Sequence, residues 1–291
     1  MSLRRILTLA VVALLLGCSR TAVGTAQNGR INVVTTISTF NSFVEAVGGS
    51  RVSVTSLVPI GGSPETYQPT PQNVATLAQA QLLIENGAGL ETWLDRTIHN
   101  AGSSTLRVVT CTDGLPIIKG NPHLWMDPQF AKRYVLKIRD ALTNIDPIHA
   151  NEYRRNARKY NEQLDRLTQE IASKIGVLPR ERRVMIVFHN AWQYYNDRFG
   201  ITTLGSIEPS PGQEPNPQSL AQLVDLAKAH HVRAIFGEPE YSPKLAQQLA
   251  HSAGISIVSN LYDDSLGTDW HIRDYIAMLR YDTEVIVAAM Q

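Results

Sequence analysis

The feature that most constrains the fold is a long amphipathic pattern in the middle of the chain. After Asp146 and Pro147, apolar residues recur at helical spacing as far as residue 175, with charged or polar residues between them. This spacing predicts a single helix of about 29 residues, which at ~1.5 Å per residue is over 40 Å long. Asp146 suits the N-cap and Pro147 the first turn, and a helix of this length can link two lobes as a stiff spine. The apolar stripe consists of Tyr153, Ala157, Tyr160, Leu164, Leu167, Ile171 and Ile175.

Short runs rich in β-branched residues lie on both sides of this helix. Helical patterns separate the runs, and strands alternating with helices are typical of parallel sheets. Because the alternation occurs twice, we predict an α/β fold of two lobes, each a mainly parallel four-stranded sheet with flanking helices. The predicted units are an N-terminal lobe over 31–145, the linking helix over 146–176 and a C-terminal lobe over 177–291, with a cleft between the lobes. The strand runs are 31–38, 52–59, 80–87, 106–113, 182–189, 201–207, 232–239 and 255–262.

The first residues have the pattern of an export signal. Arg4 and Arg5 precede an apolar run of about 12 residues, which is too short to span a bilayer comfortably. The run ends in LLGC, which resembles the bacterial lipobox, whose cysteine receives lipid and becomes the first residue of the mature protein. We therefore expect a signal peptide over 1–17, lipidation at Cys18 and a polar tether over 18–30, with an ordinary cleaved signal as the alternative. The protein is then exported, and either anchored by lipid to the outer face of the bacterial cytoplasmic membrane or periplasmic.

The net charge and the number of cysteines argue against a nucleic-acid partner and against an internal disulfide. The chain has 27 basic and 26 acidic residues, a net charge of +1 and no basic run, so nucleic acid is not expected as a partner. It has two cysteines. If Cys18 carries lipid, Cys111 has no partner for an internal disulfide, which an exported protein of 291 residues does not need.

Histidines and carboxylates follow four of the predicted strands. In parallel α/β sheets, ligands bind beyond the carboxyl ends of the strands, so these side chains can face one cleft. Two imidazoles and two carboxylates there would suit a divalent metal. On spacing alone, each histidine is equally explained as a hydrogen-bonded structural residue, and the aspartate as a turn former beside Asp263. The candidates are Glu65 in GGSPETYQPTPQN, His123 in NPHLWMDP, His189 in VFHNAW and Asp264 in LYDDSLG.

These motifs resemble those of the zinc/manganese ABC-transporter solute-binding lipoproteins, the helical-backbone metal receptors. GGSPETYQPTP matches that family's first ligand loop, G-x-x-P-H-x-Y-x-P-T-P, except at Glu65. NPHLWMDP matches its D-P-H-x-W-x-D-P segment at His123, and FHNAWQYYNDRFG matches the strand end that carries the third ligand, His189. YDDSL matches the Y-x-D-S-L segment that carries the fourth, Asp264. The resemblance covers the chain in order, from the lipobox to the last helix.

The resemblance implies a metal receptor rather than an enzyme. It implies two lobes spanned by a rigid helix, a metal ion in the cleft between them and only small domain movement on binding. It also implies a partner, a membrane permease powered by a cytoplasmic ATPase, to which the chain delivers the ion. We expect the chain itself to be a monomer.

The ligand set departs from the family at one position, because Glu65 stands where the family has histidine. Two imidazoles with two carboxylates suit both zinc and manganese, but the Irving–Williams order favours zinc at equilibrium. We therefore predict Zn²⁺, with Mn²⁺ and Fe²⁺ as alternatives. Glu65 is either a direct ligand or faces solvent while a water completes the coordination. Three reserve carboxylates are Glu208, Glu214 and Glu238, and the last of these could orient a ligating histidine.

Two other functions fit parts of the pattern. In a zinc hydrolase, His123, His189 and Asp264 would hold the metal and Glu65 would act as general base to a bound water. The chain has no HExxH-like motif to support this function. A receptor for a metal chelate such as a siderophore or haem would instead need a wide cleft lined with aromatic or arginine side chains.

Overall fold

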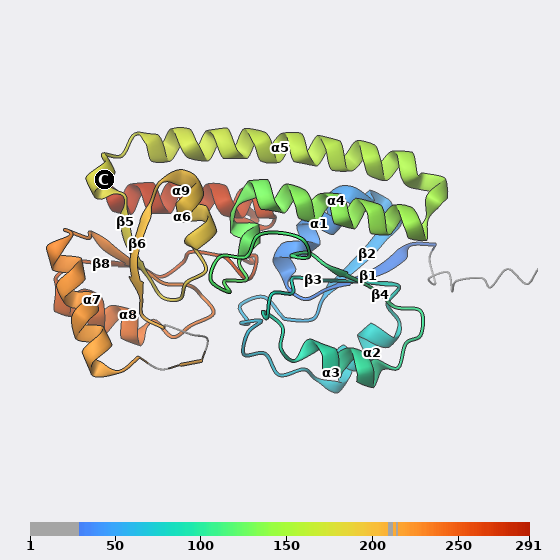
Figure 1. Cartoon of the computed structure of the whole chain (residues 1–291), viewed down its shortest axis with the longest axis horizontal. Helices are drawn as coiled ribbons and strands as arrows, with labels where there is room; N and C mark the ends of the chain where they lie inside the picture. The colour runs from blue at the N-terminus through green and yellow to red at the C-terminus, as the bar shows by residue number, and fades with distance from the viewer. Residues whose placement is uncertain (1–28, 209–211, 214) are drawn as a thin grey trace, which may run out of the picture.

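Two parallel four-stranded sheets lie side by side, and one long helix runs over both (Figure 1). The computed structural model describes residues 29–208, 212–213 and 215–291. The predicted signal peptide, Cys18, most of the predicted tether and Glu214 lie outside the described residues. The first sheet contains β1 (Ile31–Thr35), β2 (Val52–Ser56), β3 (Leu82–Glu85) and β4 (Arg107–Thr110), and the second contains β5 (Val184–Val187), β6 (Thr202–Ser206), β7 (Ala234–Phe236) and β8 (Ser256–Val258).

The two sheets have the same strand order. The first runs β2-β1-β3-β4 and the second β6-β5-β7-β8, and all neighbouring strands pair in parallel. In each sheet the order reverses at the two central strands, and such a switch point leaves a crevice at the carboxyl ends. The loops that carry the candidate ligands leave from these carboxyl ends in both lobes.

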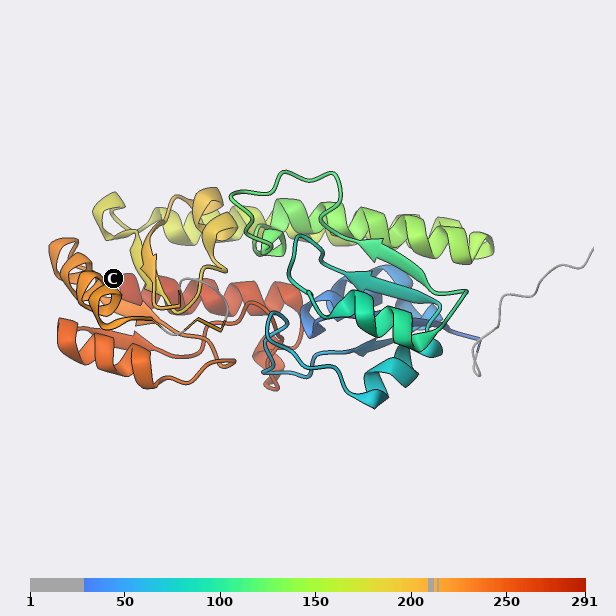
Figure 2. The ribbon, with the colours of Figure 1, turned by 60° about the horizontal axis from the view of Figure 1, so that its bottom comes forward.

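Helices cover both faces of each sheet. On one side, α2 (Pro71–Ala78) and α3 (Leu94–Ala101) pack on the first sheet, and α7 (Pro217–Ala229) and α8 (Lys244–Ala253) pack on the second. On the other side, one layer of helices serves both lobes (Figure 2). A continuous hydrophobic cluster runs through this layer and includes buried side chains of both sheets. The shared layer consists of α1 (Ser38–Gly48), α4 (Pro128–Ile145), α5 (Ala150–Gly176), α6 (Gln193–Phe199) and α9 (Tyr275–Met290).

The long helix α5 has 27 residues and buries the whole predicted apolar stripe. At ~1.5 Å per residue it is about 40 Å long, and it extends over both lobes (Figure 1). It begins three residues later than the sequence suggests, because Pro147–His149 form a 3₁₀ turn. Asp146 does not cap the helix; its Oδ2 accepts hydrogen bonds from His149 Nδ1 and Tyr153 Oη at 2.6 and 2.7 Å. Neither α5 nor any other helix in the described residues is long and apolar enough to cross a membrane.

The α/β fold predicted from the sequence is confirmed. Each of the eight β-branched runs contains one strand, and helices lie between them. Asp127 is the N-cap of α4, where its Oδ1 accepts a hydrogen bond of 2.9 Å from the backbone N–H of Gln129.

Polar contacts tie the lobes to each other. Arg198 on α6 pairs with Asp127 at 2.7 Å, and the side chain of Tyr194 donates to the carbonyl of Asn121 at 2.8 Å. Together with the shared hydrophobic layer, these contacts hold the loops of the two lobes in a fixed relation.

Candidate metal centre

The four ligand candidates meet between the lobes. Glu65 and His123 lie on the loops after β2 and β4, and His189 and Asp264 lie on the loops after β5 and β8. One donor atom from each lies within 4.8 Å of all the others. His123 Nε2 is 3.4 Å from His189 Nε2, 3.6 Å from Asp264 Oδ1 and 3.8 Å from Glu65 Oε1. Two ligands of a tetrahedral ion, each at ~2.1 Å, are about 3.4 Å apart, so these separations resemble those of donors around one ion.

The loop that carries Glu65 is braced at both ends. Trp93 Nε1 donates to the carbonyl of Pro64 at 2.7 Å, and Thr70 and Asn73 form a reciprocal capping box at the start of α2. The backbone of Glu65 is partly exposed, but its side chain is only 7% exposed. The prolines and the capping box therefore hold this carboxylate in the interior, facing the two histidines.

His123 is oriented by Asn121. Asn121 Oδ1 accepts from the backbone N–H of His123 at 3.0 Å and from its Nδ1 at 2.9 Å. The orientation of the amide is fixed because its Nδ2 donates to the carbonyl of Asn190 at 2.6 Å. Nδ1 of His123 therefore carries the proton, and the Nε2 lone pair faces the other candidates.

His189 is oriented by a carboxylate. Its Nδ1 donates to Glu238 Oε2 at 2.7 Å, and the other oxygen of Glu238 accepts from Trp192 Nε1 at 3.2 Å. Glu238 thus lies within hydrogen-bond distance of His189, and its role in orienting a metal-bound ring stays a prediction. A carboxylate behind a ligating imidazole fixes the ring and makes the far nitrogen a better donor, and here that nitrogen, Nε2, faces His123.

The two candidate carboxylates have buried oxygens with no hydrogen-bond partner among the described residues. Both carboxylate oxygens of Asp264 are in this state, as is Oε2 of Glu65. Burial raises the pKa of Asp264 well above its usual range and also raises the pKa of Glu65. An ionised carboxylate buried without a partner is strongly unfavourable, and a divalent cation between the two groups would remove that penalty.

The pKa values of the two histidines are shifted in opposite directions. Burial, together with the neighbouring His189, lowers the pKa of His123 well below its usual value, so its ring is neutral and able to bind metal. Burial also acts to lower the pKa of His189, but Glu238 and Asp263 act against it and hold that pKa well above its usual value. An ion that binds His189 must displace this proton, which makes binding dependent on pH.

Sequence reasoning missed two residues of the centre. Asp263 has a side chain that is 0% exposed, and its Oδ2 lies 3.7 Å from His189 Nε2. His189, Glu238 and Asp263 form a second group of donors within 4.8 Å of one another. The signal for Asp263 was the pair of adjacent aspartates in YDDSL, which the sequence analysis interpreted only as a possible turn. Asn121, in NPH, gave no signal beyond its place next to the histidine motif.

A cavity of about 260 Å³ leads to the centre from outside. Glu65, His123, His189 and Glu208 are among the residues that line it. Burial raises the pKa of Glu208, and the described residues of the lining include no Phe, Tyr, Trp or Arg side chain. The structure thus places Glu208 next to the four candidates, although outside their group of donors.

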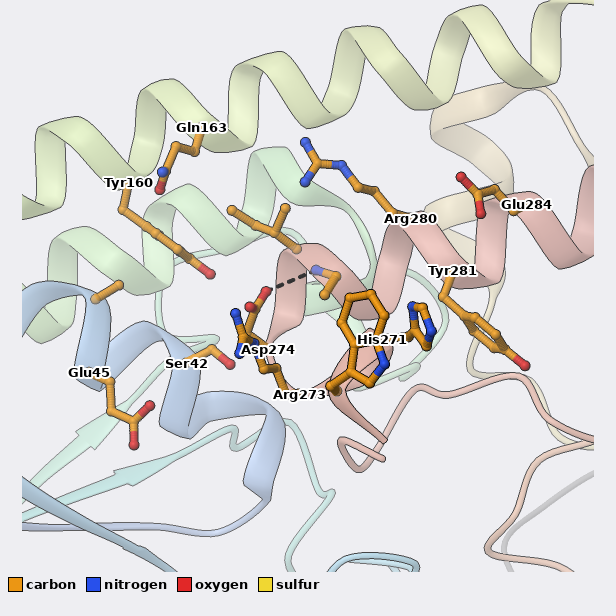
Figure 3. A pocket seen from close by; sticks show the side chains of 14 residues that line it. Ser42, Glu45, Tyr160, Gln163, His271, Arg273, Asp274, Arg280, Tyr281 and Glu284 are labelled. Carbon is orange, nitrogen blue, oxygen red and sulfur yellow. Dashed lines mark hydrogen bonds between the residues drawn. The ribbon is translucent and has the colours of Figure 1, made fainter. Parts of the chain in front are cut away.

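A larger cavity, of about 690 Å³, lies apart from these residues between α1, α5 and α9 (Figure 3). Its charged side chains have both signs, and some of them have partners. Asp274 caps α9 by accepting from the backbone N–H of Ala277 at 2.9 Å, and Arg280 pairs with Glu170 at 2.9 Å. Within the described part of the chain, this cavity brings together no group of metal donors like that between the lobes.

The sequence places the chain in a known family. Residues 33–289 match the model of the family described as "Zinc-uptake complex component A periplasmic", or ZnuA. The chain belongs to the ZnuA family. Its members are extracytoplasmic metal-binding components of ABC importers that bind their substrate rather than transform it. The prediction of a binding protein and not an enzyme is thereby confirmed.

Individual relatives of the ZnuA family cover nearly the whole chain. The manganese-binding lipoprotein MntA of Halalkalibacterium halodurans is 30% identical over 291 residues, which are 98% of this chain and 96% of the relative. The iron ABC transporter substrate-binding lipoprotein MtsA of Streptococcus pyogenes is 25% identical over 290 residues, 94% of each chain. A crystal structure of ZnuA has a TM-score of 0.82 at 28% identity and covers 90% of this chain and 100% of that one.

Proposed function

We propose that the chain captures one divalent transition-metal ion between its lobes, with Glu65, His123, His189 and Asp264 as ligands, and delivers it to an ABC importer. The convergence of these four donors within 4.8 Å, two from each lobe, carries the proposal. Buried carboxylate oxygens without partners and two imidazoles held with Nε2 toward the centre are what a cation site requires.

Zn²⁺ is the ion that we expect to bind most tightly. The proposed set supplies four ligands, the number that zinc prefers, and two of them are imidazoles. The Irving–Williams order places zinc above manganese and iron(II) for such a site. The relatives carry names that refer to manganese and iron, and the family model refers to zinc, so membership alone does not select the metal.

A titration with and without Glu65 tests this site. We expect the mature chain, stripped of metal, to bind one ion with the affinity order Zn²⁺ above Fe²⁺ and Mn²⁺, measured by competition with a chelator. Glu65→Ala should lower the Zn²⁺ affinity by about 10- to 100-fold or more, because even residues that only support a ligand contribute that much.

Glu208→Ala is the matched control, since Glu208 lies on the wall of the same cavity. We expect it to change the Zn²⁺ affinity by less than about threefold, because it is outside the four donors. Full affinity in Glu65→Ala would show that a water, and not this carboxylate, completes the coordination. Failure of the unmodified chain to bind any stoichiometric metal would refute the function itself.

Delivery requires a membrane permease and a cytoplasmic ATPase, which the name of the MtsA relative as an ABC transporter substrate-binding lipoprotein supports. We expect the chain to act as a monomer, because a single chain supplies the whole donor set. A siderophore or haem receptor fits the site less well, because the cavity of about 260 Å³ has a polar wall among its described residues.

Lipid at Cys18 would hold the protein at the outer face of the cytoplasmic membrane, as the lipobox-like LLGC suggests. We expect the wild-type chain to sediment with membranes and Cys18→Ser to appear in the soluble fraction, with unchanged metal affinity. Immunoblots of fractionated cells measure this. Cys111→Ala is the control, because Cys111 is buried and should not affect the anchor. Equal partition of wild type and Cys18→Ser would contradict lipidation.

A further inference from the structure

We propose that Asp263 is an additional metal-contact residue, whose Oδ2 joins the coordination of ions that take more than four ligands and thereby sets the metal preference of the site. The inference rests on the proposed function and extends its ligand set. It assigns to Asp263 a role that differs from that of Asp264, although the two residues are adjacent.

The carboxylate of Asp263 is buried, and only one of its two oxygens accepts a hydrogen bond among the described residues. Its side chain is 0% exposed, and its Oδ1 accepts from the backbone N–H of Asp264 at 2.6 Å. Its Oδ2 has no hydrogen-bond partner among the described residues. A turn-forming aspartate needs only the first of these oxygens. The second is the kind of buried, unpartnered acceptor that calls for a cation.

The geometry directs this oxygen to the metal centre. Asp263 Oδ2 lies 3.7 Å from His189 Nε2, which is within 0.1 Å of the separations of 3.6 and 3.8 Å that join His123 Nε2 to Asp264 and Glu65. Because Nδ1 of His189 is engaged by Glu238, Nε2 is the nitrogen left for a metal. Asp263 therefore approaches His189 on the side where an ion would bind.

The backbone of Asp263 is held by the opposite lobe. Its carbonyl accepts from Trp125 Nε1 at 3.0 Å and from Thr39 Oγ1 at 3.3 Å, and both donors belong to the first lobe. The loop therefore cannot turn this residue outward without breaking contacts between the lobes. These contacts hold the backbone from which the carboxylate of Asp263 reaches His189.

Coordination chemistry makes this oxygen selective. Zinc prefers four ligands, which Glu65, His123, His189 and Asp264 supply. Manganese prefers six, mostly oxygen, and gains from a further carboxylate. Asp263 is not in the group of four donors that all lie within 4.8 Å, but it shares His189 with them. It is thus a ligand that a four-coordinate ion leaves free and a larger coordination shell can use.

The test compares two metals in the metal-stripped mature chain and in Asp263→Asn, which keeps the size and the Oδ1 acceptor. We expect the Mn²⁺ affinity to fall about tenfold or more, and the Zn²⁺ affinity to change by less than about threefold. Glu240→Gln is the charge control, because its Oε2 is also buried without a partner in the described residues and it lies outside both donor groups. It should change both affinities by the same factor.

Equal losses of both metals in Asp263→Asn, or no loss of either, would overturn the inference while leaving the proposed function in place. A wild-type chain that binds neither metal would refute the proposed function instead. A second measurement needs no variant and so does not depend on its folding. A crystal structure of the wild-type chain with bound Mn²⁺ should show Asp263 Oδ2 among the ligands, and an Mn²⁺ ion bound without that oxygen would overturn the inference.

Discussion

Replacing Asp264 by asparagine should lower the affinity for Zn²⁺ and Mn²⁺ by at least about 100-fold and, in the absence of metal, make the chain more stable. Both carboxylate oxygens of Asp264 are buried and unpartnered among the described residues, and burial raises its pKa well above the usual range. Asparagine has nearly the same shape without the charge. At about pH 8 the substitution should raise the free energy of unfolding of the metal-free chain by about 1 kcal/mol, the lower end of the penalty for an unsatisfied buried group.

Asp282→Asn is a matched control for this experiment. Asp282 is 0% exposed, and its Oδ2 also has no partner in the described residues, but its Oδ1 accepts from the backbone N–H of Tyr262 and it lies outside the donor groups. Its substitution should leave the affinity for both metals within about threefold of wild type. Chelator competition and urea unfolding measure the two effects. Metal binding by Asp264→Asn at wild-type strength would exclude Asp264 as a ligand.

Acidification should affect the metal-free and metal-bound forms in opposite directions. Burial raises the pKa of Glu65, Asp263 and Asp264, and raises that of Glu240 to about 7, although a hydrogen bond from Ser265 acts against it. In the unfolded chain these carboxyl groups have pKa values near 4. The folded chain therefore takes up protons at a higher pH than the unfolded chain, so its stability increases as the pH falls from about 8 to about 6.5.

The two histidines also affect how the stability of the metal-free chain depends on pH. The pKa of His189 is also raised in the folded chain, which adds stability on the acid side that is lost as the pH rises through its folded value. His123 opposes this below about pH 6.5, because its pKa is lowered and the unfolded chain then binds the proton instead.

Metal binding has the reverse dependence. An ion must displace the protons that the centre holds, so the apparent Zn²⁺ affinity should fall by about tenfold or more for each unit of pH below about 8. Thermal melts in the presence of a chelator measure how the stability of the metal-free chain depends on pH, and Zn²⁺ titrations at three pH values measure how the affinity does. A metal-free chain whose stability falls between about pH 8 and about pH 6.5 would contradict the buried acid cluster.

The sequence predicts the fold well because the relevant signals are local and repeated. The stripe from Tyr153 to Ile175 can be buried only along a helix, and the β-branched runs fit only the interior of parallel sheets. The four ligand candidates followed from the rule that ligands lie beyond the carboxyl ends of such strands. Their donors lie together in the structure, while their ligation stays a prediction.

The features that the sequence does not predict depend on contacts between distant segments of the chain. That the carboxylates of both Asp263 and Asp264 lie beside the two histidines depends on the backbone of one loop, which Trp125 and Thr39 hold from the other lobe. The orientation of His123 depends on an amide that is itself fixed by Asn190. No periodicity or motif spacing encodes such contacts. The later start of α5 is similar, since Asp146 accepts from the side chains of His149 and Tyr153 and not from a backbone N–H at the start of the helix.

The shared layer of helices has a consequence for how the chain folds. Because buried side chains of both sheets belong to one hydrophobic cluster with α5 and α9, neither lobe can complete its own core alone. The last helix, α9, contacts α1 near the start of the chain, so part of the N-terminal core forms only after the C-terminal residues are in place. The native core, and with it the fixed relation of the loops that carry the four candidate ligands, therefore forms only when segments from both ends of the described chain pack together.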